Sequence, residues 1–233
     1  MGKSLSNKIK VKAKELGVSV VGIADASLYR EAPENHRPGD ILQGATGVIS
    51  IGIPLSRAVL QEAWPTQYTR SIFSSTVLID QICFQLSVWL ESQGVDSIPI
   101  PSRGPLYMEA LSGNILGDLS HKHSAMLAGL GEIGINTLLL NPDYGTRLML
   151  GSVVINGDVL PDRPFDGSVC LGEKCMKCVT SCPVGALRPT GIIDKVRCAK
   201  YYRQFQDLYF ETWGLYACRS CRSVCSKIVE KSQ

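Results

Sequence analysis

The spacing of apolar residues predicts helices and short strands that alternate over the first two thirds of the chain. Helical spacing predicts helices over residues 5–16, 70–93 and 120–128. Short apolar runs predict strands over residues 18–24, 47–53 and 146–155, with a brief extended piece at residues 98–101. Residues 25–45 and 102–119 are rich in turn formers and predict loops. This alternation indicates a layered domain of the α/β or α+β class.

The length of 233 residues leaves room for one large domain or two small ones. Pro161-Asp-Arg-Pro164 predicts the boundary, so we expect one domain over residues 1–163 and a second over residues 164–233. No apolar run approaches the ~20 residues that span a bilayer, and the lysine-rich N-terminus lacks a signal core. We therefore expect a cytoplasmic protein with no membrane partner.

Eight of the nine cysteines lie between Cys170 and Cys225, in an order typical of proteins with two iron–sulfur clusters. A cysteine that precedes proline, as Cys182 does here, ligates the other cluster in two-cluster ferredoxins. We therefore predict two [4Fe–4S] clusters with crossed fourth ligands. The first set is Cys170, Cys175, Cys178 and Cys225, and the second is Cys182, Cys198, Cys218 and Cys221.

Two other metal sites compete with this interpretation. The spacing from Cys170 through Cys175 to Cys178 also matches plant-type [2Fe–2S] proteins. Structural zinc between two C-x2-C pairs is the second alternative, and it leaves four cysteines unexplained. Cys83 lies inside a predicted core helix and is interpreted as a small buried hydrophobic residue.

The net charge of +3 is unevenly distributed along the chain. Residues 1–169 carry 13 basic and 16 acidic residues, whereas residues 170–233 carry 11 basic and 5 acidic residues. A basic tail is compatible with nucleic-acid binding. The interpretation we prefer is compensation of the negative charge of two four-thiolate clusters, so we expect nucleic acid to be an unlikely partner.

The glycines at 129, 131 and 134 match the dinucleotide-binding fingerprint in their spacing alone. That motif follows a strand and opens a helix, whereas these glycines follow a predicted helix. They favour either a close approach of the backbone to a large planar ligand or a tight turn.

The segments around these glycines resemble a known family. Ala128-Gly-Leu-Gly-Glu-Ile-Gly-Ile-Asn136, a following leucine run, Pro142-Asp-Tyr-Gly145, Arg147 and Leu150-Gly-Ser152 are similar to the core of the epoxyqueuosine reductases. Residues 13–24 resemble the family's opening segment, and the cysteine order matches, including the isolated Cys198. Reductive dehalogenases share this architecture. Residues 25–110 match poorly.

The resemblance implies an α+β fold, in which a nitroreductase-like N-terminal domain precedes a small ferredoxin-like domain of the bacterial two-[4Fe–4S] type. It also implies a base-off cobalamin that receives electrons from the clusters. Three features differ from the family. Asp118-Leu-Ser-His-Lys122 replaces an Asp-Ser-x-Pro segment that carries a catalytic acid, Ser226 replaces proline after Cys225, and no twin-arginine signal is present. These departures imply a compact relative whose substrate has diverged or been lost.

The resemblance and the residue types together give the candidate site. We expect the cobalamin cleft to be lined by Ser120, His121, Lys122, Gly129, Gly131, Gly134 and Asn136. Candidate catalytic groups are Tyr107, His121, Lys122 and Tyr144, because phenols, imidazoles and amines transfer protons. Each also has a structural interpretation: histidines near a helix start often cap it, and tyrosines often only pack.

Two classes of function are compatible with these features. The first is a cobalamin-dependent reductase of a small molecule, charged by an external low-potential donor such as ferredoxin or flavodoxin. The second is a non-catalytic electron-transfer protein that reduces a partner, for example a corrinoid protein. A flavin-containing iron–sulfur reductase is a further alternative.

Overall fold

The computed structural model describes residues 2–102, 107–108, 115–201 and 217–225. At its centre lies a four-stranded sheet in the order β1-β2-β8-β3, antiparallel throughout. The strands are β1 (Val20–Asp25), β2 (Gly47–Pro54), β3 (Asp96–Ile100) and β8 (Leu148–Asn156). β3 carries Pro99 and lies at an edge, where a missing backbone donor is tolerated. The predicted mixed fold is confirmed.

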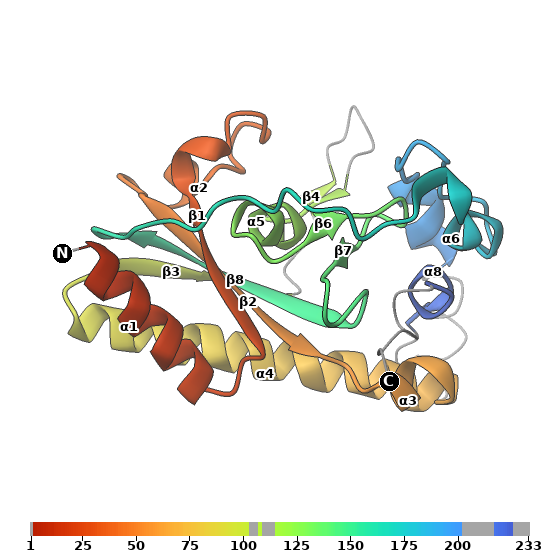
Figure 1. The fold of residues 1–233 in the computed structure, drawn as a ribbon, viewed down its shortest axis with the longest axis horizontal. Coiled ribbons are helices and arrows are strands. Elements are labelled where there is room, and N and C mark those ends of the chain that lie inside the picture. Colours follow the sequence, from red (N-terminus) through yellow and green to blue (C-terminus); the bar gives the residue numbers. More distant parts are fainter. Residues whose placement is uncertain (1, 103–106, 109–114, 202–216, 226–233) are drawn as a thin grey trace.

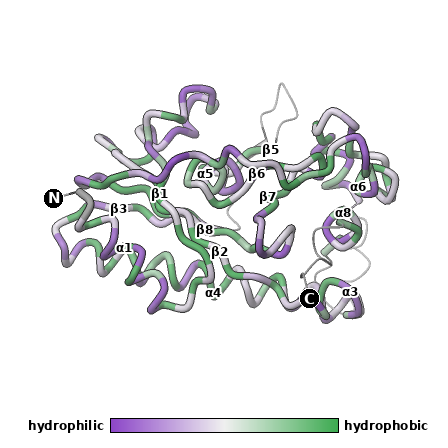
Figure 2. Tube along the Cα trace, in the orientation of Figure 1, coloured by the Kyte–Doolittle hydropathy of each residue, from purple (hydrophilic) through white to green (hydrophobic). Residues whose placement is uncertain are grey.

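Helices cover both faces of the sheet (Figure 1). α1 (Gly2–Glu15) and α4 (Pro65–Ser92) pack on one face, around Ile49, Ile51, Val153 and Ile155. α5 (His121–Leu127) packs on the other face, around Val48 and Val154. The strands therefore bury alternate residues on opposite sides, and much of the trace along the central strands has the colour of hydrophobic residues (Figure 2).

Small residues let the helices approach the sheet closely. A Cβ atom on Gly22 would lie 2.2 Å from the carbonyl oxygen of Ala128, just after α5. On the opposite face, a Cβ atom on Gly151 would lie 2.4 Å from Ile79 of α4. Gly22 pairs across the sheet with Ser50, and Ser50 pairs with Ser152. Because the side chains in this row are small, α5 can pack close to the sheet here.

The 28-residue α4 has a mean hydropathy and length that suffice, by composition alone, to cross a membrane. The prediction that no apolar stretch approaches that length is therefore corrected. The inner face of α4 is buried in the core through Ile79, Ile82, Cys83, Leu86 and Leu90. Length and composition alone are weak evidence for a membrane span, and 28% of the apolar window of α4 is buried inside the protein. Cys83 is buried against the sheet, as predicted.

Shorter elements complete the described chain. They are η1 (Ala26–Leu28), α2 (Pro38–Ile41), α3 (Arg57–Gln61), β4 (Tyr107–Met108), β5 (Ile115–Leu116), β6 (Glu132–Ile133), β7 (Leu139–Leu140), η2 (Gly172–Lys174), α6 (Lys177–Thr180) and α8 (Ser220–Ser223). β4 pairs with β5 and β6 pairs with β7, each as a separate two-stranded sheet. The predicted loop at residues 25–45 thus contains two short helices, and the glycine segment contains a hairpin.

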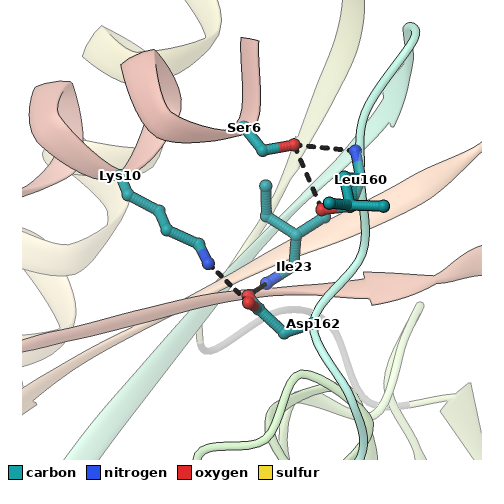
Figure 3. A network of polar contacts seen from close by, with 5 residues as sticks. All are labelled: Ser6, Lys10, Ile23, Leu160 and Asp162. Carbon is teal, nitrogen blue, oxygen red and sulfur yellow. Dashed lines mark hydrogen bonds and ion pairs between the residues drawn. The ribbon is translucent and has the colours of Figure 1, made fainter. Parts of the chain in front are cut away.

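The segment after β8 is held against the sheet by a polar network (Figure 3). Asp162 accepts a hydrogen bond from the backbone N–H of Ile23 at 2.9 Å and pairs with Lys10 at 2.5 Å. The hydroxyl of Ser6 bonds both the N–H and the carbonyl oxygen of Leu160. These contacts fix the path of the chain toward the cysteine-rich region. The domain boundary predicted at residues 163–164 falls just beyond them and stays a prediction.

We expect Asp162→Ala to lower the free energy of unfolding by about 1–3 kcal/mol, because the Ile23 amide loses its acceptor. Asp162→Asn should cost less. It keeps an acceptor oxygen and removes only a partly exposed ion pair, worth about 0–1 kcal/mol. Urea denaturation of both variants measures the difference. Equal losses for both variants would contradict the assignment of the backbone hydrogen bond as the stronger contact.

Candidate metal centres and the neighbouring surface

The structure brings the first predicted set of cysteines together around one cavity. Cys170, Cys175, Cys178 and Cys225 line it, although Cys225 lies 47 positions after Cys178. The remaining walls are Ile135, Asn136 and Leu140 on one side and Leu171, Gly172, Met176 and Lys177 on the other. The chain turns sharply here: Met176 has a left-handed backbone with φ of 48°.

The second predicted set also gathers in one place. Burial raises the pKa of the Cys198 thiol, and the nearby Cys218 and Cys182 raise it further. Burial likewise raises the pKa of Cys221 to about 12, with Cys218, Cys198 and Cys182 acting in the same direction. Arg222 opposes them. Cys182 thus acts electrostatically on members of the second set, and Cys170 and Cys175 act on the pKa of Cys178 in the first set.

The donor set of the first cavity has the chemistry that an iron–sulfur cluster needs, because four cysteines line it. Within the described residues, no three His, Cys, Asp or Glu side chains converge as they would around one metal ion. In a [4Fe–4S] cluster each cysteine binds a different iron, so four thiolates surround a volume larger than one ion. The four-cysteine cavity of the first set has this character. Loading with iron stays a prediction.

A carboxylate outside the cysteine region holds the first set in place. Glu132 of β6 accepts hydrogen bonds from the backbone N–H groups of Val169 and Cys170 through one carboxylate oxygen. Two donors next to a cluster ligand are thereby satisfied by a charged acceptor, which is the stronger kind of hydrogen bond. Sequence reasoning missed Glu132, because 38 positions separate it from Cys170 and no spacing rule connects them.

The turn between β6 and β7 contacts the second set. Asn136 is buried, and its amide donates to the carbonyl oxygen of Cys221 at 3.4 Å while its oxygen accepts from the N–H of Leu138. Thr146, just before β8, donates its hydroxyl to the carbonyl oxygen of Arg222 at 3.0 Å. Because Asn136 also lines the cavity of the first set, it touches both predicted centres.

His121 is engaged by the protein through both ring nitrogens. Its Nε2 lies 3.0 Å from the carbonyl oxygen of Pro101, which can only accept, so Nε2 carries the proton. Its Nδ1 then accepts from the hydroxyl of Ser152 at 2.9 Å. Burial lowers the pKa of the imidazole, which keeps the ring neutral. This geometry favours a structural role for His121 over the predicted catalytic and cofactor-binding role.

Lys122 points at the β6–β7 turn. Its Nζ donates to the carbonyl oxygen of Thr137 at 2.5 Å, and Thr137 has a left-handed backbone with φ of 58°. Burial lowers the pKa of Lys122, and nearby Lys195 lowers it further, whereas the Cys221 thiolate acts in the opposite direction. Lys122 therefore lies beside the second set. The predicted Ser120 instead bonds His123, with 2.7 Å between its hydroxyl and Nδ1.

The two predicted tyrosines lie in different parts of the chain. Tyr144 packs on the core beside α5, and the Arg147 guanidinium lies 5.4 Å from the centre of its ring. That position gives it a packing role. Tyr107 belongs to β4, opposite Leu116, and its side chain lies outside the described residues.

The glycines serve the protein's own packing. Gly131 has φ of 151°, and a Cβ atom there would lie 2.2 Å from the carbonyl oxygen of Leu140. Gly129 has φ of 77°, and its Cβ would lie 2.7 Å from the carbonyl oxygen of Arg163. At Gly134 the neighbour is the Leu140 side chain, at 2.1 Å. Of the two interpretations made from the sequence, these contacts favour the tight turn, and a role of the glycines in lining a cofactor cleft stays a prediction.

Comparison with known proteins agrees with the resemblance read from the sequence. An epoxyqueuosine reductase of Lactococcus garvieae is 27% identical over 252 residues, which cover 96% of this chain and 69% of that protein. The chain is therefore similar to the epoxyqueuosine reductases, and it spans about two thirds of the length of the relatives that it matches over 96% of its own length. No protein-family model matches it. The similarity to reductases supports the prediction of an oxidoreductase enzyme.

Solved structures show that the fold is shared. An epoxyqueuosine reductase bound to an epoxyqueuosine-modified tyrosine tRNA stem loop superposes with a TM-score of 0.66 and 20% identity, over 97% of this chain and 65% of that one. A reductive dehalogenase associated with B12-dependent dehalogenation superposes with a TM-score of 0.72 and 18% identity, over 100% of this chain and 33% of that one. The tRNA complex counts against the prediction that nucleic acid is an unlikely partner.

We expect Glu132→Ala to speed hydrogen exchange at the amides of Val169 and Cys170 by about ten- to hundredfold. The loss of a charged acceptor costs each amide about 1.5–3 kcal/mol. Mass spectrometry of the 165–175 segment measures this effect without any bound metal. Glu173→Ala, a change of the same residue type on exposed η2, should leave these amides unchanged. Unaltered exchange in Glu132→Ala would refute the contact.

Proposed function

We propose that the chain is an iron–sulfur reductase in which two [4Fe–4S] clusters deliver electrons to an acceptor on the α5 side of the sheet. The observation that carries this proposal is the gathering of eight cysteines into two crossed sets of four. The crossed arrangement is typical of two-cluster ferredoxins, whose clusters lie close enough to exchange electrons. The similarity to reductases supplies the reaction class.

The chain's own residues would hold and tune the clusters. Eight thiolates ligate the iron, and Glu132 and Asn136 fix the backbone beside a ligand of each set. Lys122 and Arg222 lie near Cys221, where their positive charge offsets that of the thiolates. Removing such a cation should make the cluster harder to reduce. The buried side of Cys221 excludes water from the second centre.

The identity of the group that accepts electrons from the clusters is a separate and more specific part of the proposal. The B12-dependent dehalogenase fold favours a cobalamin, which would supply a strong cobalt-centred reductant when bound. The described residues do not fit the predicted binding mode, because the three glycines pack against protein and both nitrogens of His121 are occupied. Cobalamin is therefore proposed from similarity alone, and no reaction step is derived through it.

The substrate is proposed at the level of class. The relatives act on epoxyqueuosine, and one of them is solved with a modified tRNA stem loop, so a tRNA base joins the small molecules considered from the sequence. A specific feature keeps the second function open: the segment that carries the catalytic acid in the relatives reads Asp118-Leu-Ser-His-Lys122 here, and His121 is engaged structurally. In that function the clusters reduce a separate corrinoid or flavin protein.

Anaerobically prepared protein should contain about eight iron and eight sulfide per chain. Cys182→Ser should remove the electron paramagnetic resonance signal of the second cluster and keep that of the first. The reason is that Cys182 belongs to the second set, although it follows the first set directly in the sequence. Cys178→Ser should do the reverse, and Cys83→Ala should keep both signals. Loss of the same signal in Cys182→Ser and Cys178→Ser would contradict the crossed sets, and zinc in place of iron would end the proposal.

Titration of the anaerobic, cluster-loaded protein with cobalamin tests the acceptor. We expect saturable binding with one cobalamin per chain, followed by its absorbance and by calorimetry. Protein that carries both clusters but binds no cobalamin would favour the electron-transfer function, with reduction of a corrinoid protein as the activity to assay.

A further inference from the structure

The cavity of the first set reaches both the core and the surface. Ile135, Asn136 and Leu140 form its inner wall. Leu171, Met176 and Lys177 form its outer wall, where Leu171 is 47% exposed and Lys177 is exposed. The second set is deeper on the side of Cys221, which contacts Asn136 and lies near Lys122. A cluster in the first set would therefore have the thinner cover of protein.

The surface over this cavity is positively charged with an apolar centre. Residues 170–201 contain six basic and two acidic residues. Lys174 and Lys177 are exposed and lie on either side of Cys175, beside Leu171. Of the two acids, Asp194 is paired with Arg197 at 3.7 Å, whereas Glu173 is exposed next to Lys174, so Glu173, Lys174 and Lys177 together carry a net charge of +1. Leu171, Met176 and Lys177 of the cavity wall, together with the exposed Lys174, whose backbone N–H donates to the carbonyl oxygen of Leu171, are named the lysine patch below.

We propose that the lysine patch is the docking surface for an acidic electron-carrier protein, which reduces the first cluster directly. The inference rests on the proposed function, since it requires the first cluster to be present. Charge complementarity selects the partner: an acidic carrier is steered to the lysines, and Leu171 provides the apolar contact at the centre. Rapid electron transfer needs a short path between the two redox groups, and Leu171 both lines the cavity of the first set and is exposed at the surface.

The proposed electron transfer balances without any further reactant. One electron leaves the reduced carrier, for example a [2Fe–2S] ferredoxin, and one [4Fe–4S]²⁺ cluster becomes [4Fe–4S]⁺. No bond is formed or broken, and no proton is required. The direction of flow that follows is from the lysine patch through the first set to the second set, whose ligand Cys221 lies beside Asn136 and Lys122.

The test is the rate at which an acidic [2Fe–2S] ferredoxin, reduced beforehand, is oxidised by anaerobic cluster-loaded protein in a stopped-flow instrument. The wild-type rate constant should fall as salt rises from about 0.02 to 0.5 M, because the attraction is screened. Lys174→Glu combined with Lys177→Glu should lower the low-salt rate constant about tenfold and remove its salt dependence. Lys8→Glu, on α1 at the opposite end of the molecule (Figure 1), should match the wild type.

Dithionite, a small reductant, separates the two proposals. If it reduces the clusters of wild type and double variant equally while ferredoxin discriminates between them, docking at the lysine patch is supported. Equal ferredoxin rates in both proteins, or equal slowing by Lys8→Glu, would overturn it. The proposal would also be overturned if the reduction potential of the first cluster fell in the double variant by enough to explain the slower electron transfer. In that case the lysines would only compensate the charge of the cluster. Absence of reducible clusters in the wild type would refute the proposed function itself.

Discussion

The hairpin of β6 and β7 is the contact on which the candidate site depends, because it joins the sheet-bearing part of the chain to the cysteine-rich part. At its start, Glu132 binds the backbone at Cys170. At its turn, Asn136 binds the backbone at Cys221. Leu140 of the returning strand lines the cavity of the first set. A hairpin this tight requires glycine at 131, where any side chain would meet the carbonyl oxygen of Leu140.

The sheet positions this hairpin through α5. Gly22, Ser50 and Ser152 form a row of small side chains across three strands, and α5 lies directly on it. His121 locks the start of the helix to Ser152 and Pro101. One residue later, Lys122 is thereby aimed at Thr137 in the hairpin turn. His121 therefore fixes α5 to the sheet, and the adjacent Lys122 joins α5 to the hairpin that contacts the cysteine-rich region.

Sequence patterns predicted the parts of this arrangement that repeat or cluster. The long apolar periodicity of α4, the buried runs of β1, β2 and β8, and the four cysteines of the first set around one cavity appear in the structure at or near the expected residues. β6 and β7 were missed because two-residue strands carry no periodicity. Glu132 was missed because its contact joins distant segments. For His121 the sequence left both a catalytic and a structural interpretation open, and the positions of Ser152 and Pro101, which engage both ring nitrogens, favour the structural one.

The acidic and basic residues are concentrated in different parts of the chain. The acidic balance of residues 1–169 and the basic balance of residues 170–233 coincide with the sheet-bearing and cysteine-rich parts of the chain. A cation near a buried thiolate, such as Arg222 near Cys221, is largely neutralised by the charge of that thiolate. It therefore contributes little to the electric field outside the protein. Cations that are exposed, such as Lys174 and Lys177, keep their field at the surface. The same excess of positive charge can therefore stabilise reduced clusters from within and attract an acidic protein from outside, and burial decides which of the two tasks each residue performs.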